Sequence, residues 1–265
     1  MDLKQIENNV KSLAIEVGDW IRKERLNFNQ NLVENKDLND LVSYVDKTSE
    51  IKIIEGLKSI LPNAGFIVEE GTESKLSQYN WIVDPLDGTT NFVHGINCYA
   101  ISIALECNNE ILVGVVYEIT FNECFHASKN NGAFLNGINI SVSTTNNLAN
   151  SLIATGFPVN NFTKLPNYFT ALEFLIKNTH GIRRIGAAAA DLCFLACGRV
   201  DGFFEHNLKP WDVAAGALIV KEAGGFVTDF NLQNNWLKGG QIIACNKEIY
   251  STFAPQIANY FNESP

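Results

Sequence analysis

Two aspartates three residues apart, Asp84 and Asp87, form the part of this sequence best suited to chemistry. They follow residues 81–83, an apolar run typical of a buried strand, and Pro85 and Gly88 then favour a turn. Two carboxylates this close repel each other, so both ionise readily only with a cation between them, unless one keeps its proton. The pattern therefore predicts a turn that can hold a metal ion.

The residues after the aspartates suit an anion. Gly88 and Thr89 come at a predicted helix start, where backbone N–H groups can receive a phosphate. A divalent metal beside a phosphate is the simplest joint occupant. The alternative without any function is an ordinary Asp-Pro turn in which Asp87 heads an Asp-Gly bend.

Two longer strings carry a family resemblance. The string W-I-V-D-P-L-D-G-T-T-N-F at 81–92 resembles the signature of the inositol monophosphatase family of magnesium-dependent phosphatases. The string W-D-V-A-A-G at 211–216, continued to Gly225, resembles the distant second signature of that family, although Asp212 alone fits helix-dipole chemistry. The resemblance covers nearly the whole chain. It implies one unit over 1–265, with a metal-binding α+β half (1–147) and an α/β half (148–265).

The resemblance implies a set of metal ligands made only of oxygen donors, the ligands that magnesium prefers. Asp84 would bridge two ions, and Glu69 would serve the first. Glu69 directly follows a predicted strand at 66–68 and precedes Glu70. Two adjacent glutamates at a strand end are otherwise typical of solvated surface. The expected ligands of two or three Mg²⁺ ions are Glu69, Asp84, the Leu86 carbonyl, Asp87 and Asp212.

The resemblance also implies the catalytic residues. Glu69 and Thr89 would position a water for direct attack on phosphorus, without a covalent phosphoenzyme. Asp46 would support Thr89 through a hydrogen bond, because residues 40–46 (D-L-V-S-Y-V-D) resemble the family's D-L-V-T-x-x-D. Capping of the following helix explains Asp46 equally well. Asp212 would assist the leaving oxygen.

A further resemblance concerns the substrate. The small residues at 186–189 are similar to the family's G-[ST]-A-A, although close helix packing also explains them. His206 and Asn207 follow Glu205 where relatives often carry glycine, and Asn tolerates positive φ. We expect this departure to affect the choice of alcohol more than the mechanism. The implied substrate-binding residues are Asp87, Gly88, Thr89, Gly186, Ala187, Ala188, Glu205 and Asp212.

Several elements must position these residues. Apolar residues at helical spacing predict a helix over 6–21, and a second helix follows Asp46. Short β-branched runs over 99–142 predict an antiparallel meander, and a second strand-helix block starts at Leu152. A closing helix over 247–262 is expected to be interrupted at Pro255. This pattern is α+β with two sheets. The resemblance implies an α/β/α/β/α layered sandwich of the sugar/inositol phosphatase type.

Composition narrows the class of protein. With 46% hydrophobic and 18% charged residues, the 265-residue chain is typical of a globular protein. Its net charge of −9 argues against a nucleic-acid partner, because phosphate backbones are held by clustered Lys and Arg. No apolar run is long enough for a bilayer, and the six cysteines contain no C-x-x-C pair. We expect a reduced, cytoplasmic protein without a membrane partner.

The resemblance favours phosphate release from myo-inositol monophosphates by a lithium-sensitive homodimer. Residues 90–92 (T-N-F) favour this type, because relatives acting on bisphosphorylated nucleotides commonly carry D-G-T-K-E. Histidinol phosphate, fructose 1,6-bisphosphate and NADP are alternative substrates, since the catalytic residues do not read the alcohol. A non-enzymatic scaffold or RNA-machinery partner is the competing class.

Overall fold

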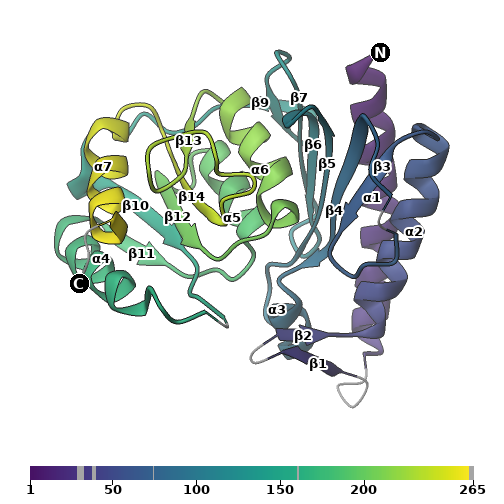
Figure 1. The fold of residues 1–265 in the computed structure, drawn as a ribbon, viewed down its shortest axis with the longest axis horizontal. Helices are drawn as coiled ribbons and strands as arrows, with labels where there is room; N and C mark the ends of the chain where they lie inside the picture. Colours follow the sequence, from purple (N-terminus) through teal and green to yellow (C-terminus); the bar gives the residue numbers. More distant parts are fainter. Residues whose placement is uncertain (29–32, 38–39, 74, 160, 263–265) are drawn as a thin grey trace.

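The protein is built from five layers that alternate between helices and sheets (Figure 1). The structure is a computed structural model and describes residues 1–28, 33–37, 40–73, 75–159 and 161–262. Two helices, a seven-stranded sheet, two central helices, a five-stranded sheet and two further helices follow one another. The α/β/α/β/α sandwich is therefore confirmed.

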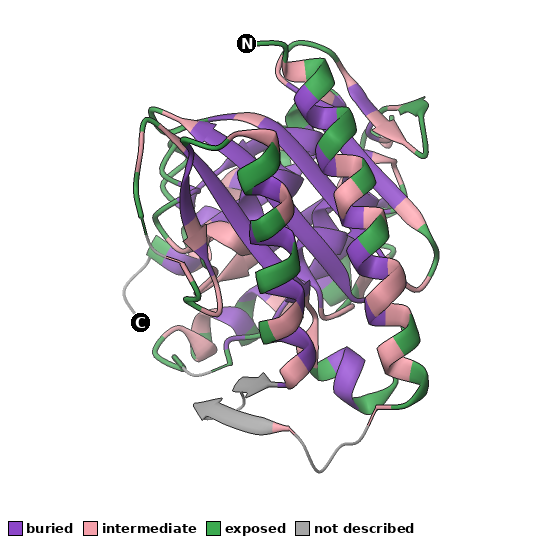
Figure 2. Cartoon of the chain, turned by 90° about the vertical axis from the view of Figure 1, so that its right-hand side faces the viewer, coloured by how far each residue is buried: buried purple, intermediate pink, exposed green. Residues whose placement is uncertain are grey.

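The first layer contains α1 (Leu3–Leu26) and α2 (Tyr44–Ile60). The predicted spacing on α1 is confirmed, because Ile6, Val10, Val17 and Ile21 are all buried. Both helices pack on one face of the larger sheet, and their outward residues remain exposed (Figure 2).

The larger sheet has the strand order β3-β4-β5-β6-β7-β8-β9. Only the β3–β4 pair is parallel; the others form the predicted antiparallel meander. Asn108, Asn109 and Asn130 adopt positive φ at the turns, as asparagine tolerates. The strands are β3 (Gly65–Val68), β4 (Tyr79–Asp87), β5 (Ala100–Cys107), β6 (Glu110–Glu118), β7 (Glu123–Ser128), β8 (Ala133–Leu135) and β9 (Ile138–Ile140).

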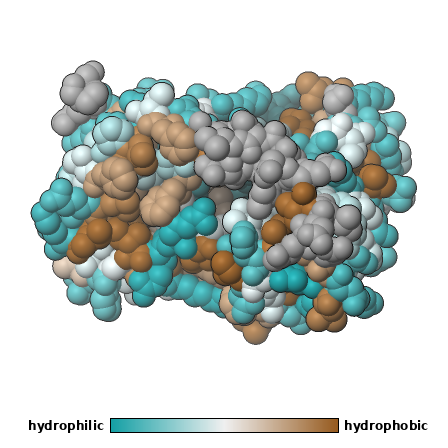
Figure 3. Space-filling view, turned by 90° about the horizontal axis from the view of Figure 1, so that it is seen from below, coloured by the Kyte–Doolittle hydropathy of each residue, from teal (hydrophilic) through white to brown (hydrophobic). Residues whose placement is uncertain are grey.

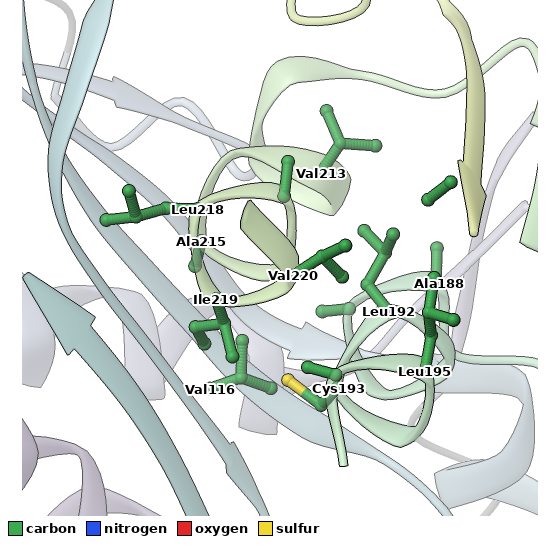
Figure 4. Close-up of a cluster of buried hydrophobic side chains, with 14 of the residues drawn as sticks. Val116, Ala188, Leu192, Cys193, Leu195, Val213, Ala215, Leu218, Ile219 and Val220 are labelled. Atoms are coloured by element: carbon green, nitrogen blue, oxygen red, sulfur yellow. The ribbon is translucent and has the colours of Figure 1, made fainter. Parts of the chain in front are cut away.

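The central layer contains α5 (Ala188–Ala196) and α6 (Pro210–Glu222), which pack against each other between the sheets. Small residues allow this: a Cβ on Gly114 of β6 would lie 2.8 Å from the Ala215 carbonyl oxygen. Leu192 and Cys193 of α5 lie beside α6 in the shared core (Figure 4). Cys193 is therefore a core residue.

The smaller sheet has the order β11-β10-β12-β14-β13, and α4 (Leu165–Asn178) and α7 (Tyr250–Asn262) cover its outer face. The expected interruption at Pro255 is wrong, because α7 continues through it. Pro255 lies in the second turn, where its missing N–H leaves only the carbonyl of exposed Ser251 without its helical partner. The strands are β10 (Leu152–Thr155), β11 (Gly181–Arg183), β12 (Gly202–His206), β13 (Phe226–Thr228) and β14 (Gln241–Cys245).

Short elements complete the chain. They are the antiparallel pair β1 (Glu34–Asp37) and β2 (Asp40–Val42), the helix α3 (Thr89–His94) and a 3-10 turn at Leu148–Asn150. Within the described ranges, no helix is both long and apolar enough to cross a membrane.

Candidate active site

The two aspartates of the first signature lie on β4, which continues beyond its expected end at the turn. Asp84 pairs with Ser102 and Asp87 with Ala100, so β4 carries one more residue than β5 between these positions. Such a bulge accommodates Pro85, which has no N–H for the ladder. Asp84 Oδ1 accepts a hydrogen bond from the Leu86 N–H at 2.9 Å.

Strand register brings Glu69 beside Asp84. Val68 pairs in parallel with Val83, so the next residues of both strands, Glu69 and Asp84, are neighbours. Side chains alternate along a strand, and Ile82, two residues before Asp84, packs into the central core. The alternation therefore directs both carboxylates toward the layer of α5 and α6.

Thr89 and Asp46 meet where α2 and α3 begin. The Thr89 hydroxyl lies 2.9 Å from Asp46 Oδ1 and 3.0 Å from the Leu86 carbonyl oxygen. Asp46 also accepts hydrogen bonds from Ser43 N–H (2.8 Å) and Oγ (2.6 Å), completing a capping box. Burial raises the pKa of Asp46, while the hydrogen bonds from Ser43 and Thr89 oppose this. The expectation that Asp46 caps α2 is corrected: Ser43 is the N-cap residue, and Asp46, the third residue of α2, completes the capping box while it contacts Thr89.

Asp87 and Asn91 connect the first half of the chain to α5. Asp87 Oδ2 accepts the Ala189 N–H at 2.7 Å, in the first turn of α5. Asn91 Nδ2 donates to the carbonyl oxygens of Cys98 (2.8 Å) and Ile185 (2.9 Å). The sequence reasoning missed this role of Asn91, although the residue belongs to the first signature.

Asp212 lies in the first turn of α6. Its Oδ2 accepts the Lys209 N–H at 2.6 Å, and Pro210 starts the helix. The Ser102 hydroxyl of β5 donates to the Trp211 carbonyl at 3.0 Å. This bond fixes the start of α6 against the strand that pairs with Asp84.

A cavity of about 130 Å³ lies where these elements meet. Glu205 projects into it beside Gly156, the residue that follows β10. A Cβ on Gly156 would lie 1.9 Å from Glu205 Oε1. Gly88 borders the same region, with φ of 88° and Gly186 O 3.2 Å from where its Cβ would be. The lining residues are Asp87, Gly156, Arg184, Gly186, Ala187, Ala188, Asp191, Glu205, Leu208 and Asp212.

Burial raises the pKa values of these carboxylates, and for Asp84 and Asp212 the charges of neighbouring carboxylates add to this effect. Burial, with the charges of Glu69, Asp87 and Asp212, raises the pKa of Asp84 well above its ordinary value. Burial and the Asp87 charge likewise raise the pKa of Asp212. Burial raises the pKa of Asp87 to about 6, although N–H groups of α5 and the Arg184 charge oppose it. A cation among these groups would relieve their repulsion.

The chemistry of the donor set fits magnesium. All predicted ligand groups offer oxygen, which Mg²⁺ prefers over nitrogen or sulfur. Among the residues the structure describes, no three His, Cys, Asp or Glu side chains are already gathered as a metal cluster. Instead, backbone N–H groups of Leu86, Ala189 and Lys209 hold Asp84, Asp87 and Asp212.

His206 and Asn207 behave differently from each other. Asn207 adopts φ of 72°, so the turn survives without glycine, as expected. His206 is not part of the cavity lining. Its N–H donates to the Tyr168 hydroxyl at 2.8 Å, and its ring lies 6.3 Å from that of Phe230. Side chains alternate along β12, so the His206 side chain points to the opposite face from that of Glu205. The predicted effect of His206 on the choice of alcohol is therefore not supported by a direct contact with the cavity.

Two further charged residues of the cavity lining were missed by the sequence reasoning, namely Arg184 and Asp191. Helical spacing could have found Asp191, because it lies three residues after Ala188 and hence on the same face of α5. No pattern in the sequence marked Arg184.

Comparison with known proteins identifies the class. A model of the inositol monophosphatase family matches residues 2–264, and the chain belongs to this family. Magnesium dependence is a general property of its members. The family assignment supports a phosphatase with a phosphorylated substrate.

Individual relatives carry two kinds of name. A "Putative Nus factor SuhB" of Neisseria meningitidis serogroup A is 44% identical over 91% of this chain and 94% of its own length. An "Inositol-1-monophosphatase" of Mesorhizobium japonicum is 41% identical over 83% and 84%. The crystal structure of the extragenic suppressor protein suhB from Bartonella henselae is 39% identical, with a TM-score of 0.89 and coverage of 97% and 98%.

Proposed function

We propose that the chain is a Mg²⁺-dependent phosphate monoester hydrolase that releases phosphate from myo-inositol monophosphates. The observation that carries this proposal is a polar cavity of about 130 Å³ with Asp87 and Asp212 in its lining, close to Asp84, on which the charges of Glu69, Asp87 and Asp212 act. All of these groups offer oxygen, which magnesium prefers. Two or three Mg²⁺ ions would be held by Glu69, Asp84, the Leu86 carbonyl, Asp87 and Asp212. Bound magnesium supplies charge neutralisation for the phosphoryl oxygens and acidifies water.

The chain's own groups would orient the attacking water. Glu69 accepts one of its hydrogens, and the Thr89 hydroxyl takes part in the same network. The bond between Thr89 and Asp46 fixes that hydroxyl, and the Asp46 side chain is itself fixed by Ser43. Asp212, as a carboxylate, would assist the leaving oxygen by accepting a hydrogen bond from the water that protonates it.

The phosphate and the alcohol would occupy adjacent places. Backbone N–H groups of Gly88 and Thr89 would bind the phosphate, since Gly88 provides no side-chain cap for α3. The alcohol would lie in the cavity against Asp87, Gly186, Ala187, Ala188 and Glu205.

Phosphate release from a panel of esters tests this proposal. The panel contains inositol 1-phosphate, histidinol phosphate, fructose 1,6-bisphosphate and NADP, each with Mg²⁺ and with Mg²⁺ plus chelator. We expect inositol 1-phosphate to give the highest kcat/KM, with loss of activity under chelation and inhibition by lithium. A higher value for another ester would replace the substrate but keep the reaction class.

A second candidate function comes from the relatives named Nus factor SuhB. The expectation that nucleic acid is no partner rested on net charge alone. The names of these relatives leave that expectation without support. A role as a partner of the RNA machinery is compatible with a working active site. Binding of the whole protein to RNA, measured by gel shift with and without Mg²⁺, tests this candidate.

We also propose a homodimer. Apolar side chains are exposed on the second half of the chain: Phe157 (43%), Phe162 (43%), Phe169 (62%) and Ile176 (68%). On the underside, the broadest brown patch lies on the left, toward α4, and smaller brown patches lie on the right (Figure 3). Exposed apolar area of this kind is typical of an interface. Sedimentation velocity should give a species of twice the 29.4 kDa chain mass.

A further inference from the structure

Asp191 is a buried carboxylate that no role described above explains. Asp191 is 1% exposed, and its Oδ1 has no hydrogen-bond partner among the residues that the structure describes. Buried polar atoms are almost always hydrogen-bonded, because leaving one without a partner costs its desolvation free energy. Asp191 lines the same cavity as Glu205 and Ala188. The unsatisfied oxygen therefore points to a ligand that donates a hydrogen bond inside that cavity.

Helix geometry explains why Asp191 reaches the cavity. Ala188 is the first residue of α5, and Asp191 follows one turn later on the same face. The backbone N–H of Asp191 donates to the Ala187 carbonyl at 2.9 Å, which fixes this turn. Asp191 is thus held on a regular helix rather than on a loop.

The surroundings of Asp191 limit what the ligand can be. Burial, together with the Glu205 and Asp87 charges, raises the pKa of Asp191 well above its ordinary value, and the Arg184 charge opposes this. A further anion would be repelled by Glu205 and Asp87, whereas a cation would be repelled by Arg184. An apolar alcohol would leave Asp191 Oδ1 unsatisfied. A neutral group that both donates and accepts hydrogen bonds fits all these neighbours, and a hydroxyl does so.

We propose that Asp191 is a specificity-determining residue that accepts a hydrogen bond from a hydroxyl group of the substrate alcohol. Glu205 would accept from another hydroxyl, and Arg184 would donate to the hydroxyl oxygens. The site therefore selects phosphate esters of polyols over esters of alcohols without further hydroxyls. This inference rests on the proposed phosphatase function and extends it to the alcohol side of the cavity.

The test compares two esters in Asp191→Ala, Asp191→Asn and the unmodified protein at saturating Mg²⁺. Inositol 1-phosphate offers several hydroxyls, whereas phenyl phosphate offers none. For Asp191→Ala, we expect the ratio of kcat/KM for inositol 1-phosphate to that for phenyl phosphate to fall by roughly tenfold, the loss of one hydrogen bond. Asp191→Asn should recover part of the ratio, because its amide oxygen still accepts a hydrogen bond.

A matched control is Asp229→Asn, a buried aspartate outside the cavity whose Oδ1 accepts the N–H groups of Asn231 and Gln233. Its ratio of the two kcat/KM values should match that of the unmodified protein. An equal loss on both esters in the soluble, folded Asp191→Asn would overturn the inference while leaving the phosphatase function intact. Absence of hydrolysis of both esters by the unmodified protein would overturn the proposed function and this inference with it.

Discussion

At the scale of single residues, the side chains proposed for chemistry also hold the structure. Asp46 completes the capping box of α2 with one oxygen and contacts the Thr89 hydroxyl with the other. Asp212 accepts the Lys209 N–H at the start of α6 and also borders the cavity. Capping and catalysis were alternatives in the sequence, and the geometry makes them compatible.

Replacement of Thr89 should affect turnover more than binding. Thr89→Ala removes the hydroxyl that Asp46 fixes, so we expect kcat to fall by about 10²-fold or more, with a smaller change in KM. Thr89→Ser should keep most activity. Thr90→Ala is the matched control, because Thr90 is the exposed next residue of α3. Equal steady-state losses in Thr89→Ala and Thr90→Ala would contradict a specific role of the hydroxyl.

The raised pKa values predict how pH acts on the metal-free protein. The pKa of Asp87 is raised to about 6 from 3.8, and that of Glu205 to about 8 from 4.5, mainly by burial. The folded protein therefore binds more protons than the unfolded chain, and stability falls as pH rises. Each group contributes fully to the free energy of unfolding below its ordinary pKa. The Asp87 contribution is lost as pH rises through about 6, and the Glu205 contribution is lost as pH rises through about 8.

Thermal unfolding in chelator should show a lower Tm at about pH 8.5 than at about pH 5.5. Added Mg²⁺ should raise Tm more at the higher pH, because carboxylate ligands must lose their protons to bind it. A metal-free Tm that rises with pH, or a Mg²⁺ effect larger at low pH, would be inconsistent with this electrostatic account.

At the scale of elements, a buried polar cluster joins the first helix to the large sheet. Glu7 of α1 pairs with His126 Nδ1 of β7 at 2.5 Å and accepts the Ser128 hydroxyl. Glu7 and His126 are 4% and 5% exposed. His126 is therefore packed in the outer core.

Glu7→Ala should lower the free energy of unfolding by about 3–5 kcal/mol, because it leaves His126 and Ser128 without their partner in the core. Urea unfolding measures this loss. The control is Glu173→Ala, which removes the exposed partner of Lys177 on α4 and should leave the unfolding midpoint unchanged. Similar midpoints for both variants would show that the cluster does not stabilise the α1–sheet contact.

Sequence patterns predicted most elements, and the exceptions have local causes. The meander and the two long N-terminal helices follow from residue spacing. The continuation of β4 to Asp87 does not, because a bulge depends on how β5 pairs with it. The course of α7 through Pro255 was missed because the proline rule was applied without its position in the helix.

At the scale of the whole molecule, the site forms where the two sheets and the central helices meet. Glu69, Asp84 and Asp87 come from the larger sheet, and Asp212 and Glu205 from the second half. The spacing of strands in the sequence does not give this arrangement, because layer order depends on contacts between distant segments. The family resemblance supplied it, whereas Asp191, Arg184 and Asn91 emerged only from the structure.

Asn91→Ala tests the connection between the halves. The change leaves the buried carbonyl of Cys98 and the carbonyl of Ile185 without their donor, so stability should fall by about 1–3 kcal/mol. We also expect weaker Mg²⁺ binding, because Asp87 and Asp212 would be held less firmly together. Calorimetric titration with Mg²⁺ checks the second effect, and unchanged affinity would contradict it.

The central claim is that the carboxylates around Asp84 and Asp87 form a magnesium-dependent phosphatase site. Its most direct test is phosphate release from inositol 1-phosphate by the unmodified protein and Asp87→Asn, each with Mg²⁺ and with chelator. We predict chelator-sensitive release that Asp87→Asn lowers by at least roughly a hundredfold, while Asp229→Asn keeps it. Release that survives both chelation and Asp87→Asn would contradict the claim.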